Sequence, residues 1–84
     1  MLEEGVWADV RVGGEHLRLF SEHSALGVHV SVYNVVTKNW IVPTEPVDDI
    51  EYGKERAAEY AAAYLKEKLN AEMPALEWKK ARSR

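Results

Sequence analysis

The segment VHVSVY, residues 28–33, alternates valine with a polar or aromatic residue. A period of two is expected for a strand that buries one face, because successive side chains of a strand point to opposite sides of its sheet. Valine and tyrosine are also common in strands, where they pack against neighbouring side chains. We therefore predict that residues 28–33 form a strand in the interior of a sheet, with the valines facing the core.

Two more strands are predicted before this segment. Residues 6–12 (VWADVRV) have valine or alanine at every second position, and residues 16–20 (HLRLF) have leucine at every second position. Gly13-Gly14 between them can adopt the positive φ angles of a two-residue hairpin turn, since glycine has no Cβ to clash. The two segments are therefore predicted to pair as an antiparallel hairpin.

The next connections are less regular. Ser21–Gly27 (SEHSALG) is polar and small, which indicates a loop or one short helical turn. Asn34 interrupts the alternation and predicts either a bulge or the end of the strand. Trp40-Ile41-Val42 is expected to be a short fourth strand. Pro43 is expected to end it, because proline lacks the N–H that a strand donates to its neighbour.

One long helix is predicted in the second half of the chain. Asp48 is expected to cap its first turn, with Glu51 three residues later reaching back toward it. Gly53 weakens this turn by about 1 kcal/mol relative to alanine, and Asn70 is expected to end the helix in the left-handed conformation. Five residues share one face at helical spacing, which predicts that this face lies on the sheet: Ala57, Ala61, Tyr64, Leu65 and Leu69.

These elements predict an α+β fold. The expected architecture is an antiparallel meander of three or four strands with one long C-terminal helix packed on one face, followed by a short tail. A chain of 84 residues supports one hydrophobic core. Residues 1–78 are therefore predicted to form a single α+β domain and residues 79–84 a basic C-terminal tail.

The composition argues against several classes of protein. The chain has no cysteine, which removes disulfide frameworks and thiolate metal sites. It has no apolar run near the roughly 20 residues that cross a bilayer. Its start, Met1-Leu2-Glu3-Glu4, lacks the basic and apolar regions of a secretory signal. We therefore expect a cytoplasmic protein that does not contact a membrane.

No pattern in the sequence predicts catalysis, a cofactor or a bound metal. Gly13-Gly14 lacks the lysine and the further glycines of a phosphate-binding loop, and no serine stands in a Gly-x-Ser-x-Gly motif. His16, His23 and His29 are six or seven positions apart, which suits neither adjacent turns of a helix nor alternate positions of a strand. The protein is therefore not expected to be an enzyme, and no cofactor, catalytic residue or metal ligand is predicted.

The sheet face opposite the helix is the most informative part of the predicted fold. One helix covers only one face, so the side chains that alternate with the buried valines and leucines are expected to be exposed. A contiguous exposed apolar patch usually marks a contact site. We therefore predict a homo-oligomer, with a different protein partner as a second option, held through six residues of this face: Trp7, Arg11, Arg18, Phe20, His29 and Tyr33.

Three alternatives use the same elements. In the first, the segment that contains Leu76 and Trp78 folds over the exposed face and completes a monomeric core. In the second, a nucleic-acid-binding domain uses the aromatic and arginine side chains of the face, with the basic tail as an electrostatic aid. In the third, a small-molecule-binding protein has its pocket between helix and sheet.

The layout of a small antiparallel sheet with one helix resembles that of HicB-like antitoxin domains and of AP2-type and phage-integrase arm-type DNA-binding domains. Pro43-Thr44-Glu45-Pro46 lacks the glycine of the HicB-like Pro-x-x-Pro-Gly segment. AP2-type sheets bear several arginines, whereas here Arg11 and Arg18 are accompanied by Asp9 and Glu15. The resemblance is therefore one of layout only, and nucleic-acid binding remains an alternative to self-association.

Overall fold

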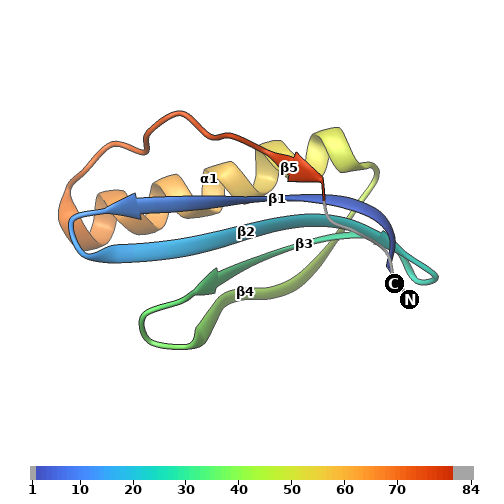
Figure 1. Ribbon diagram of the computed structural model, residues 1–84, viewed down its shortest axis with the longest axis horizontal. Helices are drawn as coiled ribbons and strands as arrows, with labels where there is room; N and C mark the ends of the chain where they lie inside the picture. Colours follow the sequence, from blue (N-terminus) through green and yellow to red (C-terminus); the bar gives the residue numbers. More distant parts are fainter. Residues whose placement is uncertain (1, 81–84) are drawn as a thin grey trace.

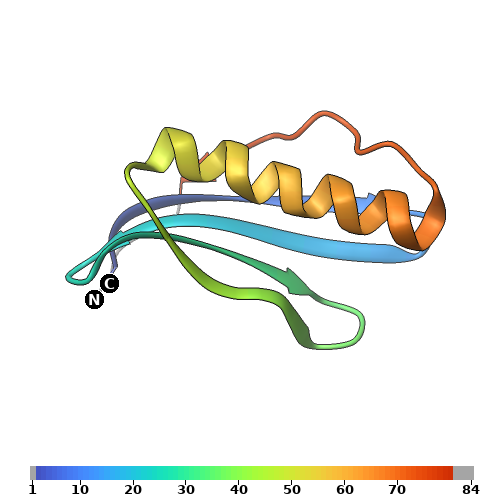
Figure 2. The same ribbon diagram turned by 180° about the vertical axis from the view of Figure 1, so that it is seen from behind.

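A computed structural model describes residues 2–80, without the side chains of residues 2–4, and shows an antiparallel sheet with one helix across one face (Figures 1 and 2). The α+β class and the single helix are confirmed, but the sheet has five strands rather than three or four, in the order β4-β3-β2-β1-β5. The elements are β1 (Leu2–Val12), β2 (Glu15–Ser24), β3 (Gly27–Asn34), β4 (Asn39–Val47), α1 (Ile50–Leu69) and β5 (Lys79–Lys80).

The first hairpin forms as predicted. Val12 pairs with Glu15 on either side of the glycine turn. Gly13 and Gly14 have φ angles of 53° and 87°, which residues with a Cβ rarely adopt. β1 begins at Leu2, four residues before the strand predicted from the alternation.

The loop predicted at residues 21–27 is wrong, because β2 continues to Ser24 and only Ala25 and Leu26 form the turn. Ser21 occupies a core-facing position of β2 and is fully buried. Its hydroxyl donates a hydrogen bond of 2.9 Å to the carbonyl oxygen of Ile50 at the start of α1. A polar residue therefore continues the buried face of the strand, and a pattern based on hydrophobicity does not detect it.

The predicted end of the fourth strand at Pro43 is also wrong. β4 runs from Asn39 to Val47 and passes through both Pro43 and Pro46. It pairs only with β3 and forms one edge of the sheet. An edge strand tolerates proline because one side of its backbone has no neighbour to receive a hydrogen bond. The pairing register also shifts on either side of Val32, which marks an irregular, bulged stretch of β4.

The N-terminal cap of α1 differs from the prediction, whereas the C-terminal cap confirms it. Asp49, not Asp48, caps the N-terminus, and its carboxylate accepts a hydrogen bond of 2.7 Å from the backbone N–H of Tyr52. At the other end Asn70 has φ 52° and ψ 38°, the left-handed conformation that was predicted. Its backbone N–H donates to the carbonyl oxygen of Lys66. The helix therefore has polar partners at both ends.

Gly53 is required where it stands, although its helix propensity is poor. It is buried at the point where the first turns of α1 cross β2 and β3. A Cβ at this position would clash with the Ser21 hydroxyl and would lie 2.9 Å from Cγ1 of Val30. The absence of a side chain therefore allows the helix to approach the sheet closely, which offsets the local cost predicted for glycine.

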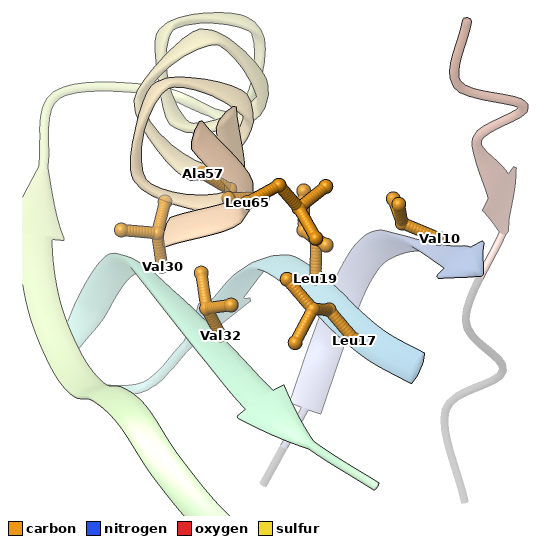
Figure 3. Close-up of a cluster of buried hydrophobic side chains, with 8 residues drawn as sticks. Val10, Leu17, Leu19, Val30, Val32, Ala57 and Leu65 are labelled. Carbon is orange, nitrogen blue, oxygen red and sulfur yellow. The ribbon is translucent and has the colours of Figure 1, made fainter. Parts of the chain in front are cut away.

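The core lies between α1 and the first three strands, as Figure 3 illustrates. The strand residues predicted to face the helix do so, although Val6, Val12 and Val28 at the margins are only half-buried. On the helix, Leu69 is 37% exposed and Tyr64 lies at the border of the core. The centre of the core is made of eight residues exposed by 2% or less: Val10, Leu17, Leu19, Val30, Val32, Ala57, Ala61 and Leu65.

The segment after the helix returns along α1 toward β1 (Figures 1 and 2). Leu76 and Trp78 pack against the core cluster on the helix side, and the ammonium of Lys54 lies 5.9 Å from the centre of the Trp78 ring. Lys79 and Lys80 then form β5 beside Val6 and Trp7 of β1. The alternative in which this segment covers the opposite face is therefore wrong.

Candidate functional site: the open face of the sheet

We call the side of the sheet opposite α1 the open face. Within residues 5–80, Figures 1 and 2 show no helix or strand lying across it. The pairing register arranges its side chains in four successive rows across the strands. The rows are Arg11 and His16; Asp9, Arg18, Tyr33 and Trp40; Trp7, Phe20 and Ser31; and Glu22 with His29.

The six residues predicted for partner binding lie on this face. They are spread over all four rows and over β1, β2 and β3. Their positions follow from the period-two alternation, because their neighbours along each strand face the core. Their role in binding stays a prediction. The full set is Trp7, Arg11, Arg18, Phe20, His29 and Tyr33.

Trp40 joins this face and was missed in the sequence. Its ring centre lies 4.7 Å from that of Tyr33 and 6.2 Å from that of Phe20, with tilted ring planes. Such tilted pairs are favourable aromatic contacts. Trp40 is nevertheless 51% exposed, which leaves it the most exposed aromatic residue of the face. The hairpin turn at residues 35–38 could have revealed it, because that turn pairs Tyr33 with Trp40.

Trp7 stands at the other side of the face with two cations on its ring. The guanidinium of Arg18 lies 5.1 Å from the ring centre, and the ammonium of Lys79 in β5 lies 5.3 Å from it. Both distances are within the range of cation–π attraction. Lys79 therefore belongs to the open face, and β5 contributes a charge to it.

Asp9 organises the polar centre of the face. Its Oδ1 atom lies 2.9 Å from both Nε of Arg18 and Nε2 of His16. Burial raises the pKa of Asp9, but the hydrogen bonds from Arg18 and His16 together outweigh that effect and lower the pKa below its ordinary value. Asp9 therefore stays ionised at neutral pH and holds the Arg18 guanidinium beside Trp7.

The two ends of the open face differ in charge. Arg11 is exposed, and within residues 5–80 it makes no side-chain ion pair or hydrogen bond. At the far end, the carboxylate of Glu22 lies 3.8 Å from Nε2 of His29. The face therefore has a cationic end at Arg11 and an anionic end at Glu22, with aromatic side chains between them.

A second polar cluster lies away from the open face and links β4 to α1. Arg56 donates to Glu45 over 3.2 Å and to Glu59 over 2.9 Å, and the Tyr60 hydroxyl donates to Glu45. The hydrogen bond from Tyr60, followed by that from Arg56, lowers the pKa of Glu45, and the same contact raises the pKa of Tyr60. Among the described residues no buried polar side-chain atom lacks a partner, and the linked hydrogen bonds of this cluster are typical of a structural contact.

The described residues show no metal site and no pocket between α1 and the sheet. Within residues 5–80, no three His, Asp or Glu side chains gather closely enough to hold a metal ion. His16 and His29 share the open face but lie in its two end rows. The space between α1 and the sheet is filled by the core, and an open hollow lies instead beside the returning segment, near Lys66 and Met73.

Comparisons with known proteins give no relative. No family model, no curated protein and no solved structure matches this chain. Among residues 2–80, the only helix is too polar to cross a membrane. The open face is therefore the feature of the molecule that bears on its function.

Proposed function

We propose that this chain is a non-enzymatic interaction module that self-associates through the open face of its sheet. The observation that supports the proposal is the aromatic cluster of Phe20, Tyr33 and Trp40. Trp40 is half exposed on this face, while Leu76 and Trp78 of the returning segment pack on the opposite side of the sheet. A contiguous aromatic patch of this kind loses contact with water when a second sheet covers it.

The size of the domain also favours a second copy. A chain this small buries a limited fraction of its surface, so further apolar burial adds substantially to its stability. Two open faces packed together would form a central pair of sheets with one helix layer outside each, the arrangement of an aligned β-sandwich. A stable pair is expected to bury about 1,200 Å² or more.

The charges of the face favour protein over nucleic acid as the occupant. A nucleic-acid surface usually presents one sign of charge toward the phosphates. Here Asp9 and Glu22 place carboxylates among the cations of the face, and the chain as a whole carries a formal net charge of −3. A surface that contains both signs is suited to contact another copy of itself.

The test is the mass of the protein in solution. Sedimentation equilibrium at about 100 μM, a concentration that detects even weak pairs, is expected to give a mass of at least twice 9.6 kDa. Trp40→Glu should yield a folded monomer, because it places an unpaired charge in the contact of both copies. Tyr52→Glu is the matched control, since Tyr52 is 47% exposed on the helix, away from the open face.

Two results would contradict the proposal. One is a monomer of the unmodified protein at this concentration. The other is a dimer that Trp40→Glu and Tyr52→Glu leave equally intact. If the unmodified protein is monomeric and instead binds single-stranded oligonucleotides with an affinity that falls steeply with salt, the nucleic-acid alternative replaces self-association.

A further inference from the structure

We infer that the second copy lies antiparallel on the first, related by a two-fold axis that runs between the two sheets and across their strands. Arg11 of each copy then lies over the row of the other copy that contains Glu22. This inference rests on the proposed self-association and specifies its geometry.

The positions of Arg11 and Glu22 define the two ends of the contact. Arg11 pairs with His16 in the first row, and Glu22 pairs with Gly5 in the fourth. Three row steps separate them, which corresponds to about 20 Å along the strands. The midpoint lies between the second and third rows at the boundary of β1 and β2, beside Phe20 at the edge of the aromatic cluster.

Only one of the two symmetric ways of stacking the faces brings these ends together. A two-fold axis parallel to the strands keeps each row against the same row of the second copy, so the Arg11 end meets another Arg11 end. An axis perpendicular to the strands reverses the order of the rows. Arg11, which makes no side-chain ion pair within residues 5–80, then lies over Gly5 of the second copy. The Glu22 carboxylate is on the adjacent strand, about 5 Å to the side and within reach of the long arginine side chain. The contact occurs twice per dimer, and opposite charges across an interface favour this orientation.

The two central rows also fit when the order is reversed. The row of Asp9, Arg18 and Tyr33 then lies over the row of Trp7, Phe20 and Ser31 of the second copy. Phe20 meets the guanidinium of Arg18 on the same strand, and Tyr33 lies over the position of the small side chain of Ser31, which its own copy already buries. A large side chain opposite a small one and a cation opposite an aromatic ring are both favourable contacts.

A charge-swap cycle tests this geometry. Arg11→Glu and Glu22→Arg are each expected to raise the dimer dissociation constant at least about tenfold, because each places like charges together at both ends. The double variant exchanges the two charges and should return the constant to within about threefold of the original. Lys66→Glu and Glu67→Lys, both exposed on α1, are the matched controls and should change it little.

A second pair of variants guards against misfolding. Glu22 pairs with Gly5 of β1, and a side chain at residue 5 would lie only 3.0 Å from its Cγ atom, so Glu22 passes close over the backbone of β1. Variants that keep the shape of the side chain therefore separate the effect of charge from any change in packing. Arg11→Gln and Glu22→Gln keep the side-chain size and remove only the charge. Each should weaken the dimer by a smaller factor than the reversal does, and each should reduce the sensitivity of the dimer to salt.

The results of these experiments distinguish the antiparallel geometry from self-association itself. A dimer that dissociates with Trp40→Glu but is indifferent to Arg11→Glu and Glu22→Arg overturns the antiparallel geometry and leaves self-association standing. The same conclusion follows if both single variants weaken the dimer and the double variant weakens it further. A monomeric unmodified protein overturns both.

Discussion

The two faces of one sheet differ in how their side chains are held. On the helix side, Leu19 and Val32 are completely buried by α1. On the open face, the rings of their neighbours Phe20 and Tyr33 pack against Trp40 and remain partly exposed. Strand residues one position apart therefore have different roles: the first set stabilises the fold, and the second is available for contact with another molecule.

The largest expected effect is a difference in stability between substitutions at two adjacent residues, one on each face of the sheet. Leu19→Ala should lower the free energy of unfolding by about 3 kcal/mol, because it leaves a cavity under the helix. Phe20→Ala should lower it by less, about 1 to 2 kcal/mol, since the ring keeps some exposure and no helix covers it in a single copy. Urea denaturation at about 1 μM, where a weak pair is dissociated, gives both values. Equal losses would mean that the open face is also part of the monomer core.

A second prediction concerns the tightest contact of the covered face. Gly53→Ala should lower the free energy of unfolding by about 1 to 2 kcal/mol, because the added methyl group clashes with Ser21 and Val30. Alanine is favoured over glycine in helices by about 1 kcal/mol, so the clash must exceed that gain. The control is Ala63→Gly at an exposed position of α1, which should cost about 1 kcal/mol. A stabilised Gly53→Ala would show that the helix can move away from the sheet without loss.

The strand alternation was enough to predict the covered face. Residues such as Val30 and Val32 repeat at every second position, and this period specifies which side is buried whatever the neighbouring strand is. The same alternation placed Trp7, Phe20 and Tyr33 on the opposite side. Most of the face proposed for binding was therefore accessible from sequence alone.

The errors have a common physical cause, which is tertiary context. Ser21 is buried because the carbonyl of Ile50 accepts its hydrogen bond, and Pro43 fits in β4 because that strand is an edge. Gly53 lies in a helix because the sheet is close to it. Trp40 joins the open face only through its pairing with Tyr33. In each case the deciding partner is distant in the sequence or depends on strand order.

The smallest expected effect is the change of stability with pH that Asp9 on the open face produces. The pKa of Asp9 is lowered from its ordinary value of 3.8 in the folded protein, with the hydrogen bonds from Arg18 and His16 outweighing the opposing effect of burial. As the pH falls, the unfolded chain therefore takes up a proton at Asp9 before the folded chain does, and protonation favours unfolding. The contribution of Asp9 is fully present above pH 3.8 and is lost as the pH falls through the lower, folded-state pKa.

Comparison of the original protein with Asp9→Asn across this range measures that contribution. The stability difference between the two should be constant near neutral pH and should shrink as the pH falls below 3.8. Thr37→Ala, a non-titrating change in an exposed turn, should give a curve parallel to that of the original protein. A difference that grows toward acidic pH would mean that burial, not the contact with Arg18 and His16, controls Asp9. The polar centre of the open face would then be a cost to the monomer that only a partner could offset.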